Sequence, residues 1–173
     1  MLQSAKKTIE AKYPGSEVTT YTASVTDYDR ISSILKEVGQ IDVLVPNVAT
    51  SHAFVPSAQV STADFAKTFD TNVVATFHII KEYLALKTSG PKVVVSVTSA
   101  SSQIVQPGNI GYGPSKAALN QMIQHLAEEN KDSDVTIQTF HPGVILTEMA
   151  KELGFDGAAF IPESGMCTFH DDP

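Results

Sequence analysis

Two stretches decide the fold: Lys92-Val93-Val94-Val95-Ser96-Val97-Thr98-Ser99 and Tyr112-Gly113-Pro114-Ser115-Lys116. The first is a run of β-branched residues, which is typical of a strand buried within a sheet. Residues 99–113, between them, are rich in Ser, Gly, Asn and Pro and predict a loop. Pro114 suits the first turn of a helix, which the pattern extends to about Asn130. The sequence therefore predicts a strand, a loop and a helix in succession.

The same alternation continues on both sides of these stretches. Asp27 is a candidate cap for a helix that Gly39 ends, and Ser61 or Thr62 opens a long helical region. Strands are predicted over 18–23, 41–45, 92–98 and 135–140, and helices over 2–13, 28–38, 62–88 and 114–130. Strands that alternate with helices of this length favour right-handed βαβ units and a mostly parallel α/β sheet.

Composition excludes several classes of protein. The 173 residues are 42% hydrophobic and carry a formal net charge of -7, with Arg30 as the single arginine, so we expect no binding to nucleic acid. No apolar run is long enough to span a membrane, and the opening residues do not resemble a signal peptide. The single cysteine, Cys167, fits a reducing compartment, and the five histidines lack paired ligand spacing. We therefore expect a cytoplasmic protein that binds neither a membrane nor a metal.

Tyr112 and Lys116 are the strongest candidates for chemistry. Residues four apart share one face of a helix, so the Lys116 ammonium can lie near the Tyr112 phenol. A nearby positive charge lowers the pKa of a tyrosine from about 10, which would make Tyr112 a usable general acid or base. Tyr83 and Lys87 have the same spacing, but they lie inside an amphipathic helix and are interpreted as a pair on its surface.

In further polar residues the chain resembles the short-chain dehydrogenase/reductase family, of the classical type. Ser99 ends a strand thirteen residues before Tyr112, and Ser99, Tyr112 and Lys116 match the family's catalytic Ser, Tyr and Lys. Asn72, in Thr71-Asn72-Val73, matches the fourth member of its catalytic tetrad. The resemblance covers residues 1–159, and it implies an incomplete Rossmann-like, doubly wound parallel sheet of about four strands.

The resemblance also implies an oxidoreductase. Hydride would pass between NADP or NAD and a small-molecule carbonyl or alcohol, with specialised metabolism as one setting. Tyr112 would exchange the proton, Ser99 would hydrogen-bond the substrate oxygen, and Lys116 would tune Tyr112 and hold the nicotinamide ribose. Asn72 would keep a backbone carbonyl and a water in place for proton relay to Lys116. The cofactor-binding residues implied are Asn47, Tyr112, Lys116, Ile145 and Thr147.

Three departures from the family pattern bear on activity. The strand, Gly-rich turn and helix that receive a cofactor pyrophosphate have no counterpart before the helix predicted over 2–13. Pro46-Asn47-Val48-Ala49 replaces the family's Asn-Asn-Ala-Gly, and residues 160–173 resemble a disordered or unrelated tail. We therefore expect a chain truncated at both ends, in which cofactor binding and activity are impaired.

An alternative is a non-catalytic family remnant that acts as a binding or dimerising partner. The resemblance implies that the helices over 62–88 and 114–130 correspond to those that form the family's dimer interface, so they are candidates for a homo-oligomer contact, while their apolar residues could equally belong to the core. The sequence leaves open the substrate, the choice between NAD and NADP and the direction of the reaction.

Overall fold

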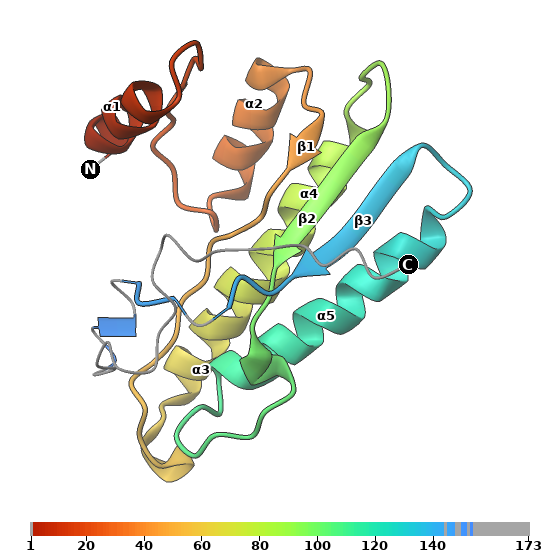
Figure 1. The fold of residues 1–173 in the computed structure, drawn as a ribbon. Coiled ribbons are helices and arrows are strands. Elements are labelled where there is room, and N and C mark those ends of the chain that lie inside the picture. Colours follow the sequence, from red (N-terminus) through yellow and green to blue (C-terminus); the bar gives the residue numbers. More distant parts are fainter. Residues whose placement is uncertain (1, 144, 148–149, 152, 154–173) are drawn as a thin grey trace, which may run out of the picture.

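Three parallel strands form the sheet of the computed structural model, in the order β1-β2-β3 (Figure 1). They are β1 (Val43–Leu44), β2 (Lys92–Val97) and β3 (Val135–Phe140). In the register, Val93 pairs with Val43 on one side and with Thr136 on the other. The structure describes residues 2–143, 145–147, 150–151 and 153, so the tail expected over 160–173 lies outside it. The parallel sheet with flanking helices confirms the expected α/β, Rossmann-like class.

Residues 18–23, predicted as a strand, are not part of the sheet, so the described residues contain three strands rather than about four. The backbone polar groups of Val18 are bonded to side chains of α1 (Leu2–Lys12) instead of to another strand. The Val18 N–H donates to Glu10 Oε1 at 3.1 Å, and the Val18 carbonyl accepts from Lys6 Nζ. An alternating segment becomes a strand only when a neighbour completes its ladder, and no described strand lies beside this one.

Two helices, α2 and α3, begin at the predicted caps. Asp27 accepts a hydrogen bond from the backbone N–H of Arg30 at 3.1 Å and opens α2 (Tyr28–Val38), which Gly39 ends. Ser61 accepts from the N–H of Asp64 at 3.0 Å and opens α3 (Thr62–Phe69). Each side chain satisfies an N–H that has no partner within its own helix.

The predicted helix over 62–88 is interrupted at Asn72. After α3 the chain makes one π turn, Asp70–Val74, before α4 (Ala75–Ala85), so the helical run ends at Ala85. A π turn holds one residue more than an α turn, and such turns are frequent at functional sites. The apolar spacing of three and four residues gives no sign of the extra residue.

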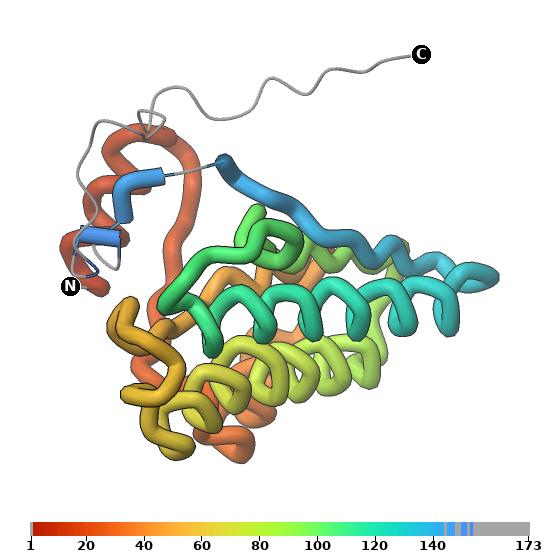
Figure 2. The backbone as a smooth tube through the Cα atoms, turned by 90° about the horizontal axis from the view of Figure 1, so that it is seen from below, coloured from red at the N-terminus to blue at the C-terminus, as the bar shows by residue number. Residues whose placement is uncertain are grey.

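The core lies between the sheet and two helices, α4 and α5 (Tyr112–Glu129), which run side by side beneath it (Figure 2). The buried members of this core are Ile80, Tyr83, Val94, Leu119, Ile123 and Ile137. Tyr83 is fully buried, and its hydroxyl donates to the Asp42 carbonyl at 3.1 Å, so the interpretation of Tyr83 and Lys87 as a surface pair is wrong. The aromatic ring is worth more inside the core than the hydroxyl costs, because the hydroxyl finds a partner there.

The opposite face of the sheet is more open. Thr136 and Gln138, which alternate with the core residue Ile137, are exposed, and Val43 is 54% exposed. Helix α1 lies apart from the sheet in Figure 1 and has no buried residue. None of the described helices is long and apolar enough to cross a bilayer.

Candidate active site

The candidate site lies where the three parallel strands end. Beyond β1, the Pro46 carbonyl accepts from the N–H of Val97 at 2.9 Å, and at the end of β3 the Phe140 carbonyl accepts from the N–H of Thr98 at 2.8 Å. These bonds align the carboxyl ends of the strands at one edge of the sheet. The residues that follow the three strands there are Asn47, Ser99 and His141. Ligands of open parallel sheets bind at such an edge.

Lys116 and Tyr112 lie together in the first turns of α5, as predicted. Lys116 is 2% exposed, and its Nζ lies 5.8 Å from the centroid of the Tyr112 ring. The ammonium donates to the Val97 carbonyl at 2.8 Å, at the end of β2. A buried lysine needs such partners, because an isolated charge in the interior is costly. The side chain is therefore fixed between the sheet and the phenol.

The pKa values of this pair differ from the expected pattern. Burial lowers the pKa of Lys116 from 10.5 to about 8. Burial also raises the pKa of Tyr112, and a hydrogen bond with Ser99 lowers it by a smaller amount. The expectation that Lys116 depresses the pKa of Tyr112 is therefore wrong for the chain alone, because loss of hydration disfavours the phenolate more than its neighbours favour it. Tyr112 is a neutral phenol at neutral pH.

Ser99 caps a short 3-10 helix, Ala100–Ser102, and is held by a side-chain network from α5. Its Oγ accepts from the N–H of Ser101 at 3.2 Å, and its carbonyl accepts from Ser102 Oγ at 2.7 Å. Asn120 Nδ2 donates to Ser102 Oγ at 3.0 Å, and Asn120 Oδ1 accepts from Thr98 Oγ1 at 2.6 Å. Asn120 thus fixes the chain immediately before and after Ser99.

The sequence interpretation missed Asn120. The available signal was its position four residues after Lys116, on the face of α5 that carries the site.

Asn72 lies in the π turn, is fully buried and uses both ends of its amide. Its Oδ1 accepts from the N–H of Thr50 at 2.8 Å, and its Nδ2 donates to the Thr50 carbonyl at 2.9 Å. The same Nδ2 donates to Ser115 Oγ at 2.9 Å, and that hydroxyl donates to the Tyr112 carbonyl at 2.7 Å. Asn72 therefore connects the loop after β1 to the first turn of α5. These bonds are a positioning arrangement, while the proton relay expected of Asn72 stays a prediction.

The three other predicted cofactor residues lie in the segments beyond β1 and β3. Asn47 is exposed and directly follows Pro46, whose carbonyl is bonded to β2. Ile145 is half-buried, and its carbonyl accepts from the N–H of exposed Thr147 at 2.9 Å. Their role in binding stays a prediction.

Comparisons with known proteins identify the family. The model of the short chain dehydrogenase family matches residues 1–156, and the chain belongs to that family. It is 43% identical over 148 residues to the short chain dehydrogenase/reductase AacuD of Aspergillus aculeatus, covering 86% of this chain and 52% of that protein. It is 41% identical over 157 residues to a short chain dehydrogenase/reductase of Claviceps purpurea, covering 89% and 53%. The chain thus spans about half the length of the curated relatives it matches, 52% and 53% of these two.

The fold comparison agrees. A short chain dehydrogenase from Burkholderia cenocepacia, in complex with NADP, superposes with a TM-score of 0.75 at 25% identity. The superposition covers 85% of this chain and 60% of that one.

Proposed function

We propose that this chain carries the catalytic half of an NAD(P)-dependent oxidoreductase that acts on a small-molecule carbonyl or alcohol. The observation that carries the proposal is the buried Lys116 ammonium beside Tyr112, which is itself hydrogen-bonded with Ser99 at the carboxyl edge of a parallel sheet. A buried lysine of lowered pKa next to a phenol and a hydroxyl is an arrangement that structural packing alone seldom needs.

The residues present fit the nicotinamide end of such a cofactor. An ammonium has three N–H donors, and the Val97 carbonyl accepts from Lys116 at 2.8 Å, which leaves donors for the hydroxyls of a ribose. Asn47 follows β1, and Ile145 and Thr147 follow β3, on the two sides of β2, and they would complete this half-site. NADP in the related Burkholderia cenocepacia protein supports this choice of cofactor class. When bound, the nicotinamide supplies or accepts the hydride.

Tyr112 and Ser99 would handle the substrate oxygen. A neutral phenol donates a hydrogen bond, so Tyr112 would donate its proton to the oxygen of a carbonyl substrate as negative charge develops there. The Ser99 hydroxyl would donate to the same oxygen and stabilise that charge. In the direction of oxidation, Tyr112 would accept the proton from the alcohol. The Lys116 ammonium near the phenol would favour the phenolate that remains after proton donation.

Specialised metabolism is one setting that we include in this proposal, and the relatives from Aspergillus aculeatus and Claviceps purpurea support only the short chain dehydrogenase/reductase class. The proposal covers both NAD and NADP as the cofactor.

A titration tests the proposal directly. Purified chain is added to NADH and NADPH, and the fluorescence of the nicotinamide is followed, which the protein leaves undisturbed because it contains no tryptophan. Saturable binding that is lost in Lys116→Ala is the expected result. Reduction of a panel of small carbonyl compounds should then depend on Tyr112. A folded chain that binds neither cofactor would contradict the proposal.

The second candidate is association through the helices, without catalysis. The helical run over 62–85 exposes large apolar side chains that a partner would cover: Phe65 at 36%, Val74 at 47% and Phe77 at 43%. Light scattering of the purified chain tests this candidate, since Phe77→Ser should shift an oligomer toward the monomer and leave a monomer unchanged.

A further inference from the structure

His52 links the loop after β1 to the residue that precedes Tyr112. Its Nε2 accepts a hydrogen bond from the backbone N–H of Gly111 at 3.0 Å, across fifty-nine positions of sequence. Gly111 is the N-cap residue of α5, and it has no side chain that could cap the helix. Amide groups at a helix N-terminus lack partners inside the helix, and the imidazole supplies one from a distant loop.

The second ring nitrogen determines the form of the imidazole. Nδ1 lies 2.6 Å from the Ala53 carbonyl, which accepts hydrogen bonds and cannot donate them, so the proton is on Nδ1. Nε2 then has a free lone pair, as the bond from Gly111 requires. The two contacts of His52 are therefore consistent with a single neutral tautomer.

The fit between the ring and Gly111 is close. A Cβ at position 111 would lie 2.6 Å from the His52 Cδ2 atom and 2.7 Å from its Nε2. Real Cβ atoms do not approach other heavy atoms so closely, so a side chain at position 111 would displace the ring. The glycine is needed here because the imidazole lies against the backbone.

His52 completes a closed path of hydrogen bonds around Tyr112. Asn72 fixes both backbone groups of Thr50, two residues before His52, at 2.8 and 2.9 Å. The same Asn72 reaches the Tyr112 carbonyl through Ser115. The branch through Ser115 therefore holds the peptide after Tyr112, and His52 holds the Ile110–Gly111 peptide, one residue before it.

We propose that His52 is a positioning residue for Tyr112: its Nε2 holds the Gly111 amide and so fixes where the phenol lies over Lys116. The hydrogen bond and its effect on Tyr112 stand on the geometry alone, while the effect on turnover rests on the proposed function. His52 does not touch the reacting atoms in this role.

Nuclear magnetic resonance of the full chain tests the proposal without any requirement for activity. In nitrogen-15-labelled protein, at a pH where the imidazole is neutral, the His52 ring should carry its proton on Nδ1 and none on Nε2. The Gly111 amide should be protected from exchange with solvent. A His52 ring protonated on Nε2 would overturn the proposal, and this measurement needs no variant to fold.

Three variants then test the consequence for Tyr112. His52→Leu keeps apolar bulk and removes the acceptor, so exchange at Gly111 should accelerate roughly tenfold, the scale of one lost hydrogen bond. The chemical shift of the Tyr112 ring carbons, assigned with Tyr112→Phe, should also change in His52→Leu. His52→Gln should restore both signals, because a glutamine amide oxygen reaches about as far as Nε2.

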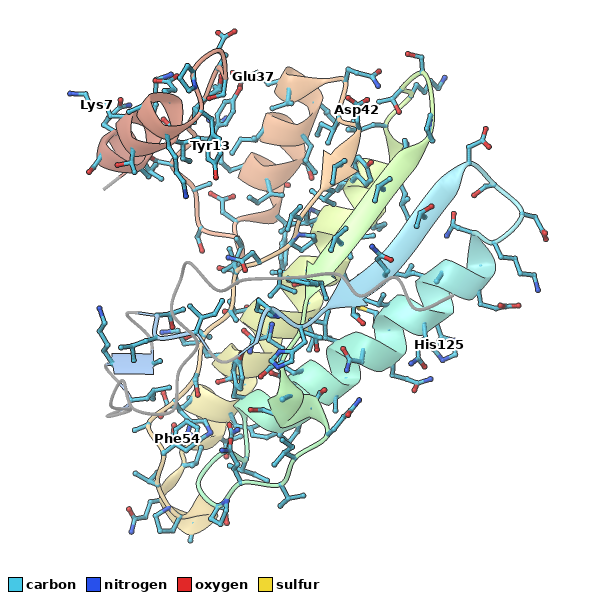
Figure 3. The ribbon with its side chains drawn as sticks, viewed as in Figure 1. Lys7, Tyr13, Glu37, Asp42, Phe54 and His125 are labelled. Carbon is cyan, nitrogen blue, oxygen red and sulfur yellow. The ribbon has the colours of Figure 1, made fainter. Side chains whose placement is uncertain are left out.

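His125→Leu is the matched control. His125 is an exposed histidine of α5, the helix that begins at Tyr112, and it lies far from the loop that carries Phe54 (Figure 3). The variant should leave both signals unchanged. Unchanged exchange and an unchanged Tyr112 ring in His52→Leu would also overturn the proposal.

Kinetics separate this inference from the proposed function. If the chain turns over, His52→Leu should lower kcat about tenfold with little change in the KM for the cofactor, and His52→Gln should recover kcat. Loss of cofactor affinity with kcat unchanged would show that His52 acts on binding instead of on Tyr112. A wild-type chain that lacks turnover but shows the Gly111 and Tyr112 effects would refute the proposed function and leave the positioning role established.

Discussion

The side-chain amide of Asn72 bonds both backbone groups of Thr50, as the backbone of a neighbouring strand would. The Asn72 amide oxygen accepts from the Thr50 N–H at 2.8 Å, and its amide nitrogen donates to the Thr50 carbonyl at 2.9 Å. Among the residues that the structure describes, no strand lies beside the loop after β1 at this point, and a side-chain amide satisfies both backbone groups. The π turn at Asp70–Val74 supplies the backbone conformation from which Asn72 makes this pair.

We expect Asn72→Ala to lower the free energy of unfolding by about 2–4 kcal/mol, because two backbone groups of Thr50 and the Ser115 hydroxyl lose their bonds to the amide. Urea denaturation followed by circular dichroism measures the change. Asn130→Ala is the control, since Asn130 bonds the Leu126 carbonyl at the far end of α5 and should cost about 1 kcal/mol. Equal losses of unfolding free energy in the two variants would show that the bonds between Asn72 and Thr50 stabilise the fold no more than an ordinary side-chain hydrogen bond does.

The buried ammonium of Lys116 should make the stability of the chain depend on pH. Its pKa is about 8 in the folded chain and returns to about 10.5 on unfolding, so between these values the unfolded chain binds the extra proton. The free energy of unfolding therefore rises as pH increases through this window, by on the order of 3 kcal/mol in full.

Denaturation at pH 7.5, 8.5 and 9.5 tests this dependence below the range where the tyrosines ionise. Lys116→Met should be more stable than wild type at the lowest pH and should lack the rise. If Lys116→Met shows the same rise in unfolding free energy with pH, groups other than Lys116 cause it.

Asn120 should affect Ser99 through the bonds it makes to Thr98 and Ser102. In Asn120→Leu the turn after Ser99 loses the side chain that holds both of its ends, so we expect kcat to fall about tenfold while cofactor affinity is kept. Gln121→Leu is the matched control, because Gln121 is exposed on the neighbouring position of α5. Kinetics and the nicotinamide titration on the same preparations separate the two effects. An Asn120→Leu enzyme with normal kcat would remove this network from the mechanism.

The tyrosines of the two Tyr-x-x-x-Lys pairs should respond differently to replacement by phenylalanine, one through stability and the other through turnover. Tyr83→Phe removes a hydroxyl bonded to the Asp42 carbonyl at 3.1 Å and should cost about 1 kcal/mol of stability, with turnover unchanged. Tyr112→Phe should reduce turnover at least about 100-fold, because the proton donor is lost. Thermal unfolding and a rate assay on both variants provide the comparison. Retained turnover in Tyr112→Phe would exclude the phenol as the acid.

Local signals explain what could be predicted from the sequence. The caps at Asp27 and Ser61 lie within three residues of the amides they bond, so the chain around them already determines where each helix begins. The spacing of Tyr112 and Lys116 fixes their common helix face in the same way. Family resemblance, rather than any local rule, placed Ser99 and Asn72 beside them.

Features that depend on distant parts of the chain could not be predicted. Residues 18–23 have a strand pattern, but no described strand lies beside them, and propensity alone does not form a ladder. The raised pKa of Tyr112 depends on how deeply the ring is buried, which spacing does not encode. The bond between His52 and Gly111 joins loops that only the folded chain brings together.

The single π turn at Asp70–Val74 also limits how this helix can change in evolution. A π turn holds one residue more than an α turn over about the same rotation, so deleting one residue from it would restore regular winding and leave α4 facing the core as before. Ile80 and Tyr83 would stay in the core, while Asn72 would lose the backbone conformation from which its amide reaches Thr50. One additional residue therefore sets the orientation of a buried amide and leaves the packing of the helical turns that follow unchanged.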